Sequence, residues 1–234
     1  MTTESNSLSP AINQAMDLFH KLLSPATEQF GLLLGEKARG YRERKLVEVL
    51  LKTDRKLADA KRQPRPVPPR FLLPFVDGCS VENDETLQDK WAGLLATASQ
   101  EGDSISPSFI ETLKQLTPED ARILDRIYDK ALKDRERMLS TLAKEIRQRV
   151  PPSRPRWITV QPRELSGPAR TSADTFERLG LLQKSYDVKN EVVTASGTDS
   201  VEDVRSEIVY TYVLNEYAQR FLDACRGPLP EGVK

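Results

Sequence analysis

An acidic cluster followed by a tryptophan is the part of this sequence whose residue types best suit chemistry. Asp84 and Glu85 lie shortly before Trp91, and carboxylates beside an aromatic wall are a pattern that acid–base catalysis can use. The same segment also fits the beginning of a buried helix, because Asn83 or Asp84 can cap it and the helix dipole favours acidic residues in the first turn. Apolar residues then follow at helical spacing on one face: Leu87, Trp91, Leu94, Leu95 and Ala98. We therefore predict that the carboxylates cap a helix and that the tryptophan packs in the core.

Other residues with catalytic or ligand-binding potential are isolated from one another in the sequence. His20 is the one histidine, so a Ser–His or Cys–His nucleophile pair would have to use it. Cys79 and Cys225 lie far apart, which indicates free thiols in a reducing compartment and leaves the usual structural zinc sets incomplete. The segment Gly31–Lys37 lacks the glycine spacing and the final Ser or Thr of a phosphate loop. We expect no catalytic residue, no metal, no cofactor and no small-molecule substrate.

The composition indicates a polar chain that can still bury a core. Of its 234 residues, 38% are hydrophobic and 30% are charged, with 35 basic residues against 35 acidic ones. This balance disfavours a dedicated nucleic-acid binder, which usually carries a basic excess. No apolar run approaches the ~20 residues that span a bilayer, and the first residues lack the pattern of a secretion signal. We expect a cytoplasmic protein.

The distribution of charge is more informative than its total. Residues 36–70 contain twelve Lys or Arg against five Asp or Glu, a segment that could contact phosphates, anionic lipid or an acidic protein. The candidate interaction surface consists of five basic residues: Lys37, Arg39, Arg42, Arg44 and Lys45. A solvated helix face followed by a connector is the plainer alternative. Residues 187–223 contain eight acidic residues against three basic ones, so phosphate repulsion would oppose DNA binding there.

The first part of the chain is predicted to be helical. Four Ser-Pro or Thr-Pro pairs are typical of helix starts: Ser9-Pro10, Ser24-Pro25, Ser106-Pro107 and Thr117-Pro118. We predict helices over 9–23, 26–60, 71–79 (entered through Pro74), 84–98, 106–116 and 117–149, with a loop over 100–107. The proline-rich segment 63–70 is predicted to be an extended connector, and a ligand for a proline-binding module is the alternative.

The pattern changes after Pro151. Strand-like segments at 156–160, 185–193 and 206–214 alternate with helical segments at 171–182 and 215–224. Strand, helix, hairpin and helix is the order of a winged helix. We therefore predict a mainly α protein, with a multi-helix domain over 1–150 and a small α+β winged-helix-like module over 151–234.

Several blocks of the chain together resemble the bacterial Abi-alpha (abortive infection alpha) family, a domain of unknown function. The matching blocks are Leu22–Lys45, Val67–Ser99, Ser106–Tyr128, Glu177–Gln183 and Tyr212–Cys225. The resemblance covers most of the chain, and the block that contains Trp91 is its most specific part. It implies phage resistance by abortive infection, in which an infected cell stops growing or dies before phage matures. It provides no catalytic residues to carry over. Residues 161–175 are short and broken by proline where a full helix–turn–helix would be expected.

These observations lead to one expected function and two alternatives. We expect a non-enzymatic protein of antiviral defence that binds another protein or itself, with peripheral membrane contact left open and nucleic acid disfavoured. The first alternative is a DNA-binding regulator, in which Arg170, Arg178 and Lys184 of the C-terminal module face DNA. The second is a membrane-perturbing helical toxin that inserts the apolar side of 9–23, where Phe19 lies.

Overall fold

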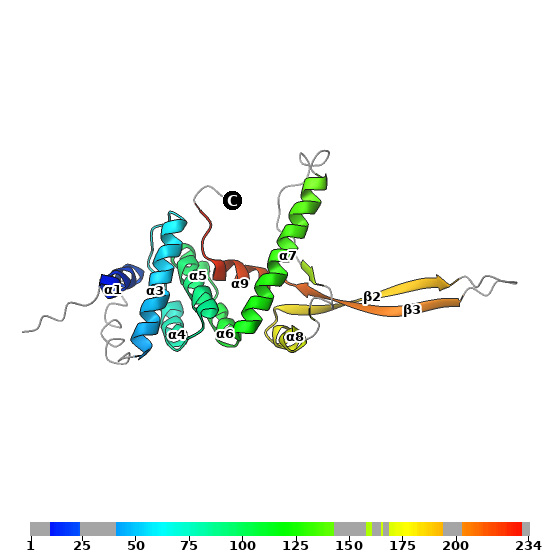
Figure 1. Ribbon diagram of the computed structural model, residues 1–234, viewed down its shortest axis with the longest axis horizontal. Helices are drawn as coiled ribbons and strands as arrows, with labels where there is room; N and C mark the ends of the chain where they lie inside the picture. The colour runs from blue at the N-terminus through cyan, green and yellow to red at the C-terminus, as the bar shows by residue number, and fades with distance from the viewer. Residues whose placement is uncertain are drawn as a thin grey trace, which may run out of the picture. The chain divides into compact units, whose positions relative to one another are not determined.

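The computed structural model describes residues 10–23, 41–142, 158–160, 165, 169–193 and 203–230, with the backbone alone described at 41–43, 135, 138–142, 187–193 and 203–210. The fold is mainly helical with one small antiparallel sheet, as predicted (Figure 1). The chain divides into two compact units, residues 1–122 with 221–234, and residues 123–220. Helices α7 (Pro118–Leu142) and α9 (Glu216–Arg226) contribute to both units. The predicted boundary at Pro151 lies outside the described residues and stays a prediction.

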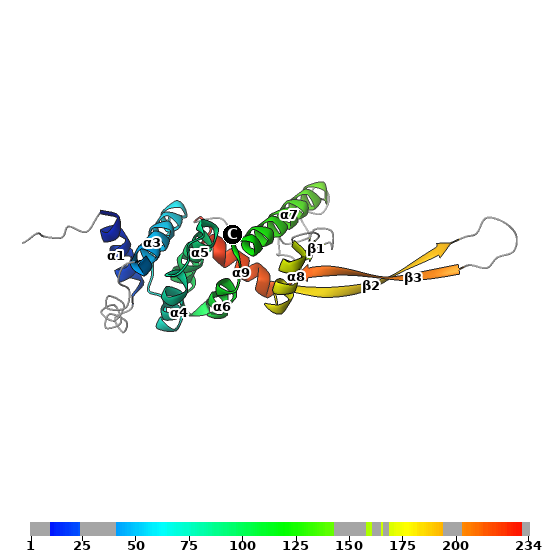
Figure 2. The same cartoon turned by 60° about the horizontal axis from the view of Figure 1, so that its bottom comes forward.

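The first unit is a group of helices around α5. It contains α1 (Pro10–Leu22), α3 (Tyr41–Asp59), α4 (Pro69–Cys79), α5 (Glu85–Glu101), the short 3-10 helix η2 (Gly102–Ser104) and α6 (Ser108–Lys114). Helix α3 packs between α1 and α5, and Figure 2 shows this arrangement from a second side. The second helix predicted over 26–60 is described from Tyr41 onward. The start signals at Ser9 and Ser24 lie outside the described residues.

The acidic cluster and the tryptophan have the structural roles predicted for them. The Asp84 carboxylate accepts hydrogen bonds from the backbone N–H groups of Thr86 and Leu87, at 2.8 and 3.2 Å, and caps α5. Trp91 is 1% exposed, and its ring meets the Phe75 ring edge to face with centroids 5.3 Å apart. The burial extends well beyond the predicted stripe, because Ala92, Ala96 and other small residues on the remaining faces of α5 are also buried.

Three predicted boundaries in this unit were wrong. Helix α4 begins at Pro69, not at Pro74, because proline suits the first helical position, where its missing N–H has no partner. The loop predicted over 100–107 is partly helical, since α5 continues to Glu101 and η2 follows. Ser106 does not cap α6. The helix begins at Ser108 without a side-chain cap, and the Ser106 carbonyl accepts the Phe109 N–H at 3.1 Å.

The cap predicted for α7 is confirmed. The Thr117 hydroxyl accepts the Asp120 N–H at 3.1 Å, and the Asp120 carboxylate accepts the Thr117 N–H at 3.0 Å. This is a capping box in which Asp takes the usual place of Glu.

The proline-rich connector is part of the first unit. It is extended up to Pro68, and its last two residues form the first turn of α4. Val67 is fully buried and donates its N–H to the Leu22 carbonyl at 2.9 Å. At the start of the connector, the Gln63 carbonyl accepts a hydrogen bond from the Gln100 amide of α5 at 2.9 Å. A proline-binding module would have to extract Val67, so the structure supports the connector interpretation.

The second unit contains the predicted strand, helix and hairpin in that order. Its elements are β1 (Ile158–Val160), α8 (Ala169–Arg178), β2 (Leu182–Val193) and β3 (Asp203–Leu214). The sheet is antiparallel with strand order β1-β3-β2. The buried residues of this unit include members of all four elements and of the segments beside them: Ile158, Val160, Leu165, Ala173, Phe176, Leu181, Leu182 and Leu214.

The predicted bounds of three elements in this unit shift, and one assignment stays a prediction. Helix α8 lies over Ala169–Arg178 and not 171–182, because Gly180 follows it with a φ of +68° and Leu182 already begins β2. Both hairpin strands begin three residues earlier than predicted. The winged-helix assignment stays a prediction, since a second helix before α8 would fall in 161–168, where Leu165 alone is described.

Candidate functional site

The structure describes the side chains of two of the five residues in the candidate interaction surface. Arg44 is exposed on α3, whereas Lys45 is half-buried and pairs with Glu48 at 2.8 Å. Arg42 lies in the first turn of α3, where the backbone alone is described. Lys37 and Arg39 lie outside the described residues. The surface is therefore placed in part, and Arg44 is its exposed member.

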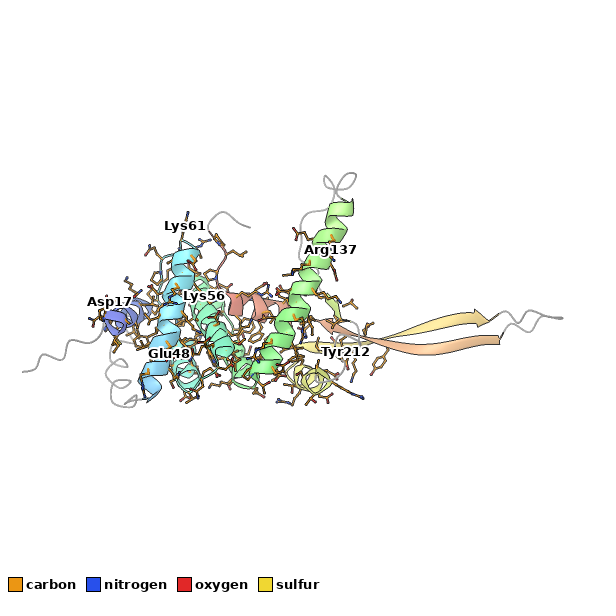
Figure 3. All side chains as sticks on the ribbon, viewed as in Figure 1. Asp17, Glu48, Lys56, Lys61, Arg137 and Tyr212 are labelled. Atoms are coloured by element: carbon orange, nitrogen blue, oxygen red, sulfur yellow. The ribbon has the colours of Figure 1, made fainter. Side chains whose placement is uncertain are left out.

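The two remaining lysines of α3 share one carboxylate of α5. Lys52 and Lys56 both approach the Asp89 carboxylate at 3.5 Å, and Lys52 also donates to the Glu85 carbonyl at 3.3 Å. Figure 3 labels Lys56 on α3, where it lies beside α5. A segment that is basic in the sequence thus directs part of its charge inward, to a carboxylate of a neighbouring helix. Sequence reasoning missed this because Asp89 is far away in the chain.

A second polar cluster also joins α3 to α5. The Gln88 amide, in a residue that is 3% exposed, donates to the Glu48 carboxylate at 2.8 Å and to the Glu82 carbonyl at 3.2 Å. The hydrogen bond from Lys45 lowers the pKa of Glu48 below its ordinary value, burial opposes it, and the Gln88 bond adds to the lowering. These contacts hold two helices together, and the lowered pKa of Glu48 is the opposite of what a general acid needs.

Helix α8 presents the two arginines of the DNA-binding alternative. Arg170, Asp174 and Arg178 are exposed at spacings of four residues and so follow one side of the helix. The opposite side, with Ala173 and Phe176, is buried. An acidic residue therefore lies between the two basic ones on the exposed side.

Lys184, the third residue of that alternative, is held by an acidic neighbour. Its ammonium group pairs with the Glu177 carboxylate at 2.9 Å and lies 5.6 Å from the centre of the Tyr212 ring. The contact with Glu177 raises the pKa of Lys184, although burial opposes the rise. Figure 3 labels Tyr212 on β3, near the start of the hairpin. The positive charge of Lys184 is thus compensated within the protein.

The other candidates for chemistry are separated from one another. His20 is exposed on α1. Cys79 and Cys225 are buried and are not joined in a disulfide, and burial raises the pKa of the Cys79 thiol, which makes it unreactive. In the part of the chain that the structure describes, no group of three or more His, Cys, Asp or Glu could hold a metal ion. The glycine segment Gly31–Lys37 lies outside that part.

The toxin alternative depends on the apolar side of α1, which the structure buries. Phe19 is 4% exposed, and the helix packs against α3. Gln14 of α1 also donates to Asp54 of α3 at 2.8 Å. Insertion of this side into a membrane would require α1 to detach. Among the described helices, none has the length and apolar character to cross a bilayer.

Comparison with known proteins finds one family. The abortive infection alpha family matches residues 41–225, which include every described element except α1 and the last residue of α9. Neither the curated proteins nor the solved structures give a match. Because the matched range covers well over half of the 234 residues, the chain belongs to the abortive infection alpha family.

Proposed function

We propose that this chain acts in bacterial defence against phage, by abortive infection, and that it does so by binding another protein rather than by catalysis. Family membership supports the first part of the proposal. The second part rests on the mixed charge of the surfaces that carry the candidate basic residues. Protein partners suit such surfaces because they present charges of both signs.

The pairing of basic side chains with carboxylates is the observation that carries the binding mode. Lys45 pairs with Glu48, Lys52 and Lys56 share Asp89, and Lys184 pairs with Glu177. Binding to a phosphate backbone or an anionic lipid surface draws on positive charge that is not already neutralised. Ion pairs of this kind reduce the attraction of the chain to nucleic acid and to anionic lipid. They favour a protein partner, which presents charges of both signs.

The DNA-binding alternative keeps one observation in its favour. The strand order β1-β3-β2, with α8 just before β2, is the order that a winged helix has. Asp174 lies between Arg170 and Arg178 on the exposed side of α8, however, and would face the phosphates together with them. If this alternative held, duplex DNA would bind with a steep dependence on salt, and Arg178→Ala would weaken that binding.

The experiment that tests the proposal is phage infection of cells with and without the gene. We expect a panel of phages to form fewer plaques on cells that express the chain. In liquid culture, the cells should survive a low phage input and collapse at a high one, because infected cells are sacrificed. Unchanged plaques across a broad panel would contradict the defence function.

Charge-reversal variants then separate the two candidate surfaces. Arg44→Glu changes α3, the pair Arg170→Glu and Arg178→Glu changes α8, and Arg126→Glu on the exposed side of α7 is the matched control. We expect one of the first two to restore plaque formation while the control keeps protection, with the far-ultraviolet circular dichroism of all proteins unchanged. Hydrolysis of nucleotides or nucleic acid by the purified chain, lost in a folded point variant, would overturn the non-enzymatic part.

A further inference from the structure

Helix α1 lies on α3 in the way that a bound peptide helix lies on its receptor. Its buried anchors, each at most 4% exposed, are Ala15, Leu18, Phe19 and Leu22. Their spacing of i, i+3, i+4 and i+7 is the pattern by which an amphipathic helix binds an apolar surface of another protein. The remaining positions from Pro10 to Lys21 are exposed or half-buried. Helix α1 therefore contacts the protein through one side only.

The surface under α1 belongs to α3 and to the proline-rich connector. This α1-binding surface consists of four residues: Leu50, Asp54, Leu57 and Val67. The Gln14 amide of α1 donates to the Asp54 carboxylate at 2.8 Å, and the two leucines, each 1% exposed, lie four positions before and three after that carboxylate, on the same side of α3. The Val67 N–H donates to the Leu22 carbonyl at 2.9 Å.

Helix α3 is attached to the rest of its unit through a different side. Lys52 and Lys56 reach Asp89 of α5 from positions that point away from the α1-binding surface. Figures 1 and 2 both show α1 and α5 on different sides of α3. Departure of α1 would therefore leave the contact between α3 and α5 in place.

The family range contains this surface but not the helix that covers it. The match begins at Tyr41, the first residue of α3, so it includes the α1-binding surface and excludes α1. Helix α1 has 13 residues, and isolated helices of about 12–15 residues or fewer are marginal in water. Helix α1 thus depends on its packing against α3, as a peptide that folds on binding does.

We propose that α1 is a displaceable cover and that the α1-binding surface is the docking site for an amphipathic helix of a partner protein. In this state the chain fills the site with its own helix. A partner helix takes the place of α1 when it presents apolar residues at the same spacing. The inference rests on the proposed binding of a partner protein and gives that binding a site.

The charge of Asp54 indicates what such a partner helix carries. Among the described residues, Gln14 is the hydrogen-bonding partner of this carboxylate, and its amide is neutral. A Lys or Arg at the same place, one position before the first anchor, would form a charge-assisted hydrogen bond, which is roughly twice as strong. That advantage offsets the effective concentration of α1, which is on the order of millimolar for a segment of the same chain.

A lipid bilayer fits these observations less well than a helix. It would take up the apolar side of a released α1, but it would leave Leu50 and Leu57 exposed to water on α3. A partner helix covers these leucines again, so that no apolar surface is lost from the core.

The test measures binding of a fluorescein-labelled peptide of residues 9–24 to the purified full-length chain by fluorescence anisotropy. Phe19→Asp releases α1, because an unpaired carboxylate is costly to bury, and Met16→Asp places the same group on the exposed side of α1 as the matched control. We expect the peptide to bind Phe19→Asp at least about tenfold more tightly than the wild type or Met16→Asp, which α1 still covers.

A variant of the peptide tests the role of Asp54. Peptide Gln14→Lys should bind the Phe19→Asp chain at least about threefold more tightly than the unchanged peptide, and Asp54→Asn in that chain should remove the gain. An equal gain with Asp54→Asn would overturn the basic residue assigned to the partner helix.

Hydrogen exchange of the wild-type chain tests displacement without any substitution. We expect the amides of α1 to exchange at least about tenfold faster than those of α5, through local opening. Equal rates would overturn the proposal, and so would a Phe19→Asp chain that unfolds its first unit or that folds, by circular dichroism, without binding the peptide. Binding of the wild-type chain to neutral phosphatidylcholine vesicles with protection of the α1 amides would replace the partner helix by a membrane.

These experiments can fail separately from the defence function. A helix α1 that cannot be displaced, in a chain that still protects cells from phage, would remove this docking site and leave the proposed function in place. A displaceable α1 in a chain that gives no protection would do the reverse.

Discussion

Helix α5 and the β2–β3 ribbon place their apolar residues in opposite ways. Helix α5 is buried on most of its circumference, and its neighbours α3 and α6 come from the same unit. The ribbon is covered by its own unit near its base, and Tyr186 is already 67% exposed. The first element is completed by the chain itself. The second leaves Tyr186 in contact with solvent. Three changes separate these two situations, from the largest expected effect to the smallest.

Removal of Trp91 should have the largest effect on stability. Trp91→Ala would leave a cavity beside Phe75 in the first unit and cost about 3–5 kcal/mol of the free energy of unfolding. Tyr186→Ala in the ribbon should cost less than about 0.5 kcal/mol, because this side chain is exposed. Urea unfolding followed by circular dichroism measures both. Equal losses would show that the two aromatic residues have the same kind of environment.

Addition of one methyl group to Gly93 tests how closely α5 is packed. A Cβ at this position would lie 2.0 Å from the carbonyl oxygen of Cys225, in the part of α9 that belongs to the first unit. Gly93→Ala should therefore cost roughly 1–3 kcal/mol or more, although alanine favours a helix by about 1 kcal/mol over glycine. The control is Gly102→Ala, which has no atoms within reach but a φ of +56°. A stabilised Gly93→Ala variant, measured by thermal unfolding, would contradict this packing.

The two units should lose stability at opposite ends of the pH range, the first at low pH and the second at high pH. In the first unit, the carboxylates of Asp84 and Glu48 have pKa values below their ordinary 3.8 and 4.5. Burial opposes the shift at Asp84, and the N–H groups of Leu87 and Thr86 produce it. Their contribution is present above these ordinary values and is lost as the pH falls through the lowered ones.

In the second unit, Lys184 has a pKa above its ordinary 10.5. Its contribution is complete below that value and is lost as the pH rises through the raised one. Thermal unfolding across the pH range measures both effects. Asp84→Asn, which keeps an N-cap, should flatten the acid limb, and Lys184→Met should flatten the alkaline limb. Each effect is small because these groups are near the surface. If the loss of stability at low pH is unchanged in Asp84→Asn, the Asp84 carboxylate does not contribute to it.

Local sequence signals identified most elements because their causes lie within a few residues. The cap of α5, the capping box at Thr117 and the strand, helix and hairpin order all follow from residue types at short spacing. The predictions at Pro74 and Ser106 were wrong because a Ser-Pro or Pro-containing segment offers two possible first turns. Packing of the whole helix chooses between them.

The candidate site was less predictable than the fold. The excess of basic residues over 36–70 suggested an exposed positive surface. The structure shows that several of these lysines pair with carboxylates. Asp89 pairs with both Lys52 and Lys56, and Gln88 donates to Glu48, across 33 to 40 positions of sequence. Local patterns contain no signal for such pairs, so the charge that remains available to a partner could not be estimated from them.

The sequence by itself determined the helical character, the small C-terminal sheet, the structural role of Asp84 and Trp91, and the family. These depend on periodicity, capping and short motifs, whose energetics are local. The tertiary structure alone decided which lysines pair with carboxylates, that Gly93 lies against the Cys225 carbonyl, and that every second position of β2 and β3 continues the register of the buried Leu182 and Leu214. These depend on contacts between residues far apart in the chain, and only the packed helices and the strand register bring such residues together.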